Sequence, residues 1–169
     1  MSTYQDVVKT ILGEIKKVQD ADAIIATLVL TYIAIDTMSF LNMSPRKEKN
    51  GSKEFIDWVK KYMKTDNNQP YKYIGKDMWA ARCGKLHSYS SFSNYAEKND
   101  CSLYGYHSGC DHEYDSRKNK RLVIISVPRL VNDFGEGLMA FFTDISKDKE
   151  LKKRVDSRIG KINIQFDLS

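Results

Sequence analysis

Apolar residues recur with a helical period at the start of the chain. From position 7 to position 18 they fall three or four positions apart, with lysine and glutamate between them. This spacing predicts an amphipathic helix with one buried face. The next stretch, 23–42, is apolar on nearly every side of a helix, and Asp20 or Asp22 can cap its start. We expect such a helix at the centre of a bundle.

Further helices are predicted along the rest of the chain. Ser52 can cap a third helix, and a fourth follows from about Tyr71 or Gly75 to the end of the sequence RCGKLHSY. Pro128 suits the first turn of a fifth helix. A charged segment that ends at Gly160 predicts one more, with few residues to bury. The pattern therefore predicts a mainly α protein, a helical bundle of about five helices.

Two short segments and the C-terminal tail show the patterns of strands. Residues 102–107 read SLYGYH, and the β-branched run at 121–127 is bounded by a proline. The tail, 161–169, alternates apolar and polar residues, as a half-buried edge strand does. We expect a small antiparallel β element built from the region of about 95–127 and from this tail.

Composition limits the class of protein. The 169 residues suit a single domain, and 41% hydrophobic with 29% charged residues is typical of a globular protein. The net charge of +5 favours anionic partners such as RNA, DNA or phosphorylated ligands, although a basic surface also serves solubility. The most apolar stretch, 23–35, is shorter than the roughly 18–20 residues of a membrane span. Without a secretory signal, and with three cysteines, the sequence predicts a cytoplasmic protein with no membrane span.

The main candidate for chemistry is the sequence RCGKLHSY, which places Arg82 five residues before His87 and Tyr89 two residues further on. Five residues turn a helix through about 500°, so the arginine and the histidine point about 140° apart. They converge only if the helix bends near Gly84 or if the arginine reaches across a dimer interface. On spacing alone, His87 fits a packing residue at least as well as a catalyst.

This motif in a helical bundle resembles the HEPN superfamily, whose domains occur in toxins, antiphage systems and RNA-processing enzymes. Arg82 and His87 match its Arg-x4–6-His pair, and Tyr89 extends the match to the form found in HEPN toxins that are paired with a nucleotidyltransferase antitoxin. The resemblance covers the helices from Tyr4 to about Ser90. It implies a single HEPN-like domain over 1–169, with an insertion at about 95–127.

The resemblance also implies a function: a homodimeric, metal-independent endoribonuclease that needs no cofactor, with RNA as substrate and a role in toxicity or antiphage defence. Arg82 would bind the phosphate and stabilise the charge of the transition state. His87 would act as general acid or base, because its ordinary pKa of about 6.5 suits a proton shuttle. Tyr89 would bind substrate or be modified by a partner, or it is a plain amphipathic residue.

One position departs from the family pattern. The family usually places a polar residue directly after the arginine, where this chain has Cys83. This departure favours the alternative function, a non-catalytic HEPN-like module that binds RNA, a nucleotide or a protein partner.

Asp36 interrupts the most apolar helix of the chain. Because a lone buried carboxylate is costly, it should pair with a cation or face a cleft. Arg82 is the candidate partner, across the second and fourth helices. The other interpretation places Asp36 on an exposed stripe together with Thr37 and Ser39.

A loop after the motif holds four residues of the types that bind zinc: Cys101, His107, Cys110 and His112. Their spacing is not a standard zinc pattern, so we predict that no metal binds there. A zinc-stabilised interaction domain is the third functional hypothesis, and it depends on this loop. A disulfide between the two cysteines would need an oxidising setting.

Overall fold

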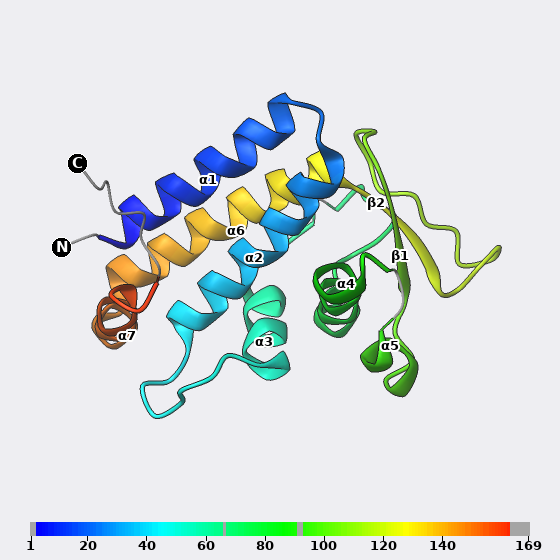
Figure 1. Cartoon of the computed structure of the whole chain (residues 1–169). Helices are drawn as coiled ribbons and strands as arrows, with labels where there is room; N and C mark the ends of the chain where they lie inside the picture. Colours follow the sequence, from blue (N-terminus) through cyan, green and yellow to red (C-terminus); the bar gives the residue numbers. More distant parts are fainter. Residues whose placement is uncertain (1–2, 66, 91–92, 163–169) are drawn as a thin grey trace.

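The computed structural model describes residues 3–65, 67–90 and 93–162, and their helices and strands follow in one order (Figure 1). The elements are α1 (Tyr4–Asp20), α2 (Ile24–Asn42), α3 (Ser52–Tyr62), α4 (Gly75–Ser88), α5 (Asn94–Lys98), β1 (Leu103–His107), β2 (Leu122–Ser126), α6 (Val127–Lys147) and α7 (Lys149–Ile159). The prediction of a mainly α protein is confirmed. The predicted strand in the tail falls almost wholly on 163–169, outside the described residues.

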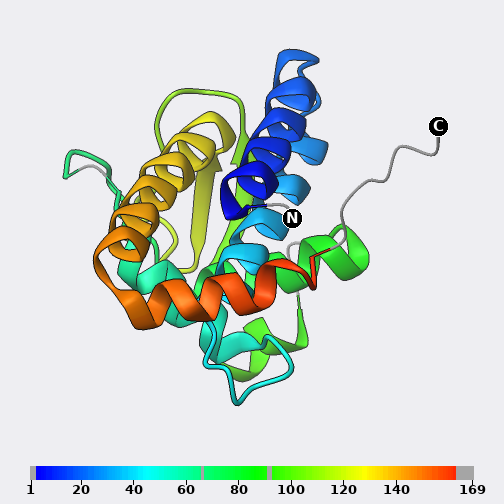
Figure 2. The same ribbon diagram turned by 90° about the vertical axis from the view of Figure 1, so that its left-hand side faces the viewer.

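Helix α2 is the central helix of the bundle, as its sequence predicts. It packs against α1, α3, α4, α6 and α7 (Figures 1 and 2). By length and composition alone its 19 residues would suffice to cross a membrane, so the apolar segment is longer than the sequence pattern of 23–35 indicates. However, half of this apolar segment is buried inside the protein, which is consistent with the core helix of a soluble protein.

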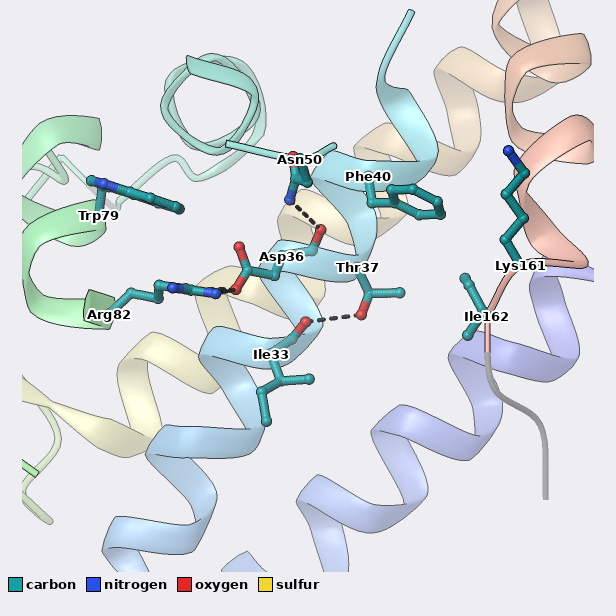
Figure 3. A pocket seen from close by; sticks show the side chains of 9 residues that line it. All are labelled: Ile33, Asp36, Thr37, Phe40, Asn50, Trp79, Arg82, Lys161 and Ile162. Atoms are coloured by element: carbon teal, nitrogen blue, oxygen red, sulfur yellow. Dashed lines mark hydrogen bonds and ion pairs between the residues drawn. The ribbon is translucent and has the colours of Figure 1, made fainter. Parts of the chain in front are cut away.

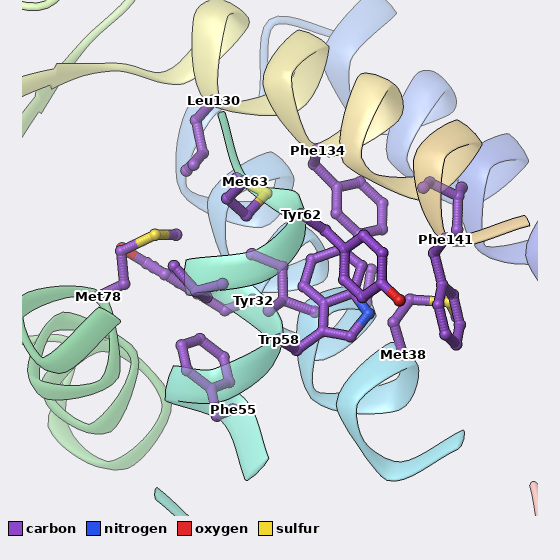
Figure 4. Close-up of a cluster of buried hydrophobic side chains, with 14 of the residues drawn as sticks. Tyr32, Met38, Phe55, Trp58, Tyr62, Met63, Met78, Leu130, Phe134 and Phe141 are labelled. Carbon is purple, nitrogen blue, oxygen red and sulfur yellow. The ribbon is translucent and has the colours of Figure 1, made fainter. Parts of the chain in front are cut away.

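Aromatic side chains fill the space between α2, α3 and α6 (Figure 4). The ring of Trp58 on α3 is fully buried and lies 6.1 Å from the rings of Phe134 and Phe141 on α6. Tyr62, one turn further along α3, contacts Phe141 at 5.2 Å. Large aromatic rings contribute much of the buried apolar area of a core, so this cluster fixes α3 against α6.

The two strands form a parallel pair, with Leu103 opposite Leu122 and His107 opposite Ser126. The expected antiparallel arrangement was therefore wrong. The physical reason lies in the connection: parallel strands need a crossover of a dozen or more residues, and segment 108–121 returns the chain to the starting end of β1. Within this segment Glu113 forms an antiparallel bridge with Ile124, so β2 is bonded along both edges.

Helix α4 carries the Arg-x4-His motif and lies close to α3. A Cβ added to its first residue, Gly75, would lie 2.9 Å from a side-chain carbon of Ile56 and 3.0 Å from its carbonyl oxygen. Glycine is thus required where the two helices meet. On its other sides α4 contacts α2, α5 and β1, and this packing holds the motif beside the central helix.

Candidate functional site

Arg82 and Asp36 form an ion pair across α4 and α2. The Nε and Nη2 atoms of the arginine each lie 2.6 Å from Oδ2 of the aspartate, and both side chains are less than one-fifth exposed (Figure 3). The predicted pairing of these two residues is confirmed, and Asp36 does not lie on an exposed stripe. If either charge were removed, the other would remain unpaired in a poorly hydrated position. The two side chains therefore stay together, and the ion pair holds the guanidinium in one orientation.

Burial dominates the electrostatics of this pair. It raises the pKa of the Asp36 carboxyl above the usual value, and the nearby Arg82 charge opposes this rise. The pKa of the neighbouring Cys83 thiol is also raised by burial, again against the influence of Arg82. A raised thiol pKa keeps Cys83 neutral at pH 7, so it adds no negative charge beside the guanidinium.

Two neighbouring residues hold the pair in place. The guanidinium carbon of Arg82 lies 4.9 Å from the ring centre of Trp79, a cation–π contact within α4. Asn50, in the loop before α3, donates from Nδ2 to the carbonyl oxygen of Asp36 and to the hydroxyl of Ser39. Sequence reasoning missed both residues. The i, i+3 spacing of Trp79 and Arg82 was a usable signal, whereas Asn50 lies in a polar loop that showed none.

The ion pair lies at a pocket of about 370 Å³ between α4, α2 and the residues after α7. Figure 3 shows Trp79 and Arg82 reaching in from α4, with Lys161 on the opposite side. The pocket is also lined by Ile33 and Asn50. It therefore combines an aromatic ring, two cations, one carboxylate and apolar walls.

His87 and Tyr89 do not line this pocket. Helix α4 is unbroken α-helix through both motif positions, with no π-helical turn at Gly84, so Arg82 and His87 leave the helix in different directions. His87 is exposed in the last turn. Tyr89 ends the helix in a left-handed conformation, with φ of 53°, and is 71% exposed. One chain does not bring the predicted catalytic pair together.

Lys85 is a buried cation that sequence reasoning missed. It lies on α4 between the two motif residues, and its Nζ donates to the carbonyl oxygen of Tyr89 at 3.3 Å. The same nitrogen lies 5.1 Å from the ring centre of Tyr106 on β1. These contacts tie the C-terminal turn of α4 to the sheet and thereby fix where His87 is presented.

The cysteine and histidine loop is organised by hydrogen bonds. His112 is buried: its Nδ1 accepts from the Ser126 amide, and its Nε2 bonds to the Tyr73 hydroxyl. Cys101 is buried against the carbonyl oxygen of Lys76, whereas Cys110 is exposed. All three cysteines are free, and no group of three metal-ligating side chains occurs among residues 3–65, 67–90 and 93–162.

The candidate site thus consists of an oriented arginine at an open pocket and an exposed histidine further along the same helix. This arrangement can bind a phosphate and, where a second copy supplies the histidine, move a proton beside it. No protein-family model, curated protein or solved structure matches the chain.

Proposed function

We propose that the protein is a HEPN-like, metal-independent endoribonuclease that acts as a homodimer. The observation that carries this proposal is the fixed orientation of Arg82 by Asp36 at an open pocket, with an exposed His87 on the same helix. Asp36 engages Nε and Nη2, so Nη1 is the part of the guanidinium that would meet a phosphate oxygen. Arginine binds phosphate well because its planar donors stay charged at all working pH values.

The proposed reaction is a transfer within the RNA chain. His87 removes the proton of a 2′-hydroxyl, and the oxygen attacks the neighbouring phosphorus. The bond to the 5′-oxygen of the next nucleotide breaks, and that oxygen takes up the proton that the same His87 has accepted. The products end in a 2′,3′-cyclic phosphate and a 5′-hydroxyl. Arg82 stabilises the extra negative charge of the transition state.

A dimer supplies what one chain lacks. Because Arg82 and His87 point about 140° apart on a regular helix, the arginine of one subunit works with the histidine of the other. Ile25 and Ile33, two turns apart on α2, are both more than 40% exposed, as is Tyr89 at the end of α4. Exposed apolar side chains of this kind favour burial against a second copy.

The biological setting is part of the same proposal. We infer a cytoplasmic protein that acts as a toxin or in antiphage defence, with a nucleotidyltransferase antitoxin as partner. The support for a partner is the exposure of Tyr89, whose hydroxyl an enzyme can reach for modification.

One observation favours the second candidate, a non-catalytic module that binds RNA, a nucleotide or a protein. Cys83 follows Arg82 and is neutral, so a polar group that the family usually supplies beside the arginine is missing. In this case Arg82 would bind phosphate without cleavage.

The first test is RNA cleavage by the pure protein in EDTA. His87→Ala should lower the rate by roughly 10²–10⁴-fold, and Arg82→Ala by a similar factor. The matched controls are His107→Ala, which removes a histidine at the end of β1, and Arg117→Ala, which removes an arginine from an exposed loop. Both controls should cleave like the wild type.

Three outcomes would contradict catalysis: cleavage that persists in His87→Ala, cleavage that needs magnesium, or a monomeric wild type without cleavage. Binding of RNA that depends on Arg82, with no cleavage, would favour the second candidate.

A further inference from the structure

The pocket beside Arg82 contains an aromatic surface, the ring of Trp79, that the cleavage reaction does not use. The indole ring of Trp79 and the guanidinium plane of Arg82 lie together at its α4 side (Figure 3). Nucleobases that are splayed out of a strand stack on aromatic rings and on arginine planes. The pocket volume of about 370 Å³ falls within the range of about 300–1,000 Å³ that small-molecule sites occupy.

One polar group that lines the pocket is an acceptor that the protein leaves unused. Both bonds from Arg82 end on Oδ2 of Asp36, which leaves Oδ1 without a bond to the described residues. A ligand that fits here should therefore bring hydrogen-bond donors, and the amino group of a base carries two.

The charges around the pocket favour an anion attached to that base. Arg82 and Lys161 contribute two positive charges, against one negative charge from Asp36. Lys161 is exposed on the side of the pocket opposite Arg82 (Figure 3). A phosphate attached to a base in the pocket would therefore have a cation on each side, Arg82 and Lys161.

We propose that this pocket is a nucleotide subsite that binds a base with an amino group, stacked on Trp79 and Arg82 and hydrogen-bonded to Asp36. The inference rests on the proposed function in one respect: the natural occupant is a nucleotide of the RNA next to the cleaved bond. Binding of a free mononucleotide needs no cleavage, so the subsite can be tested separately.

Tryptophan fluorescence reports on this binding. The chain has two tryptophans: Trp58 is fully buried in the core, and Trp79 lines the pocket. Titration with GMP, AMP or CMP should quench the emission of the wild type. UMP lacks an amino group and should bind roughly tenfold more weakly. Ribose 5-phosphate should not quench, and Trp79→Phe should show no quenching with any nucleotide.

Calorimetric titration with GMP measures how much each residue contributes to nucleotide binding. Arg82→Ala should weaken binding at least tenfold, and the matched Arg117→Ala should leave it unchanged. His87→Ala should bind like the wild type, because His87 does not line the pocket. A short single-stranded RNA should displace GMP if the subsite serves RNA. If RNA does not displace GMP, the ligand of the pocket is a free nucleotide instead.

The proposal is overturned if millimolar GMP does not bind, if quenching survives in Trp79→Phe, or if UMP binds as well as GMP. These results are independent of cleavage. A wild type that binds GMP but cuts no RNA would refute the proposed catalysis and keep the subsite. A wild type that cuts RNA but does not bind GMP would refute the subsite and keep the proposed catalysis.

Discussion

At the scale of single residues, the Asp36–Arg82 pair was the part of the site that sequence reasoning predicted best. A carboxylate inside an apolar helix must find a partner, and Arg82 was the candidate on a neighbouring helix. The contacts made by Asn50 and Lys85 had no such signal, because a polar loop residue and a helical lysine are usually exposed. Asn50 joins the site through its bonds to α2, and Lys85 joins it through the packing of α4 against β1.

Replacement of Asp36 tests this pair. Asp36→Ala should lower the free energy of unfolding by about 2 kcal/mol, less than for a fully buried pair because both side chains keep some contact with water. Asp36→Asn should cost less, since the amide oxygen can still accept from Arg82. Urea denaturation measures both. The control, Asp57→Ala, breaks an exposed pair with Lys53 and should cost below about 0.5 kcal/mol. Equal losses in Asp36→Ala and the control would contradict a buried pair.

His112 gives the fold an acid sensitivity. Burial, together with the charge of Arg129 and the influence of His107, lowers its pKa from 6.5 to about 4, although Asp111 acts in the opposite direction. Protonation of Nδ1 would also place its hydrogen against the Ser126 amide, which is itself a donor. The unfolded chain binds this proton at about pH 6.5, and the folded chain does so only near pH 4.

The free energy of unfolding should therefore keep the full contribution of neutral His112 above pH 6.5 and fall as the pH drops towards 4. Protonation of His112 accounts for at most about 3 kcal/mol of this fall. Unfolding in urea at several pH values between 4 and 7.5 measures the slope. His112→Gln should lower stability at pH 7.5 but flatten the slope. A wild-type slope that His112→Gln leaves unchanged would show that other groups cause it.

At the scale of elements, most helices and both strand segments were predictable, but the short helix α5 and the direction of the strands were not. Helical periodicity is a local signal, so α1, α2, α3 and α6 follow from their own residues. The direction of two short strands depends on the path of the 14 residues between them, as the parallel pairing of β1 and β2 shows. Helix ends were also predicted within a few residues: α6 begins one residue before Pro128, with Ser126 as its cap.

Two glycines of α6 should respond in opposite directions. A Cβ on Gly137 would lie 2.8 Å from the carbonyl oxygen of Tyr62 in α3, whereas a Cβ on Gly135 would meet nothing within 4 Å. Gly135→Ala should raise stability by roughly 0.5–1 kcal/mol, because alanine is the better helix former. Gly137→Ala should lower it by roughly 1–3 kcal/mol through overpacking. Thermal unfolding of both variants checks this, and a shift in the same direction would contradict the close contact of α3 and α6.

At the scale of the whole molecule, the described chain presents an incomplete site. The Arg-x4-His motif was visible in the sequence, but its two residues leave one regular helix in different directions. The exposed isoleucines of α2 were equally hidden, because a sequence apolar on every side does not reveal which side stays uncovered. Both features support the proposal that the functional unit contains two copies.

The most direct test of this account uses a mixed dimer. Arg82→Ala and His87→Ala chains carrying different tags are expressed together, and the heterodimer is isolated by two affinity steps. It retains one intact pair, the arginine of one subunit with the histidine of the other. Each homodimer should be roughly 10²–10⁴-fold slower than the wild type. The heterodimer should recover about half of the wild-type cleavage rate, because it restores one of two sites. A heterodimer as inactive as the two homodimers would contradict a catalytic pair shared between subunits.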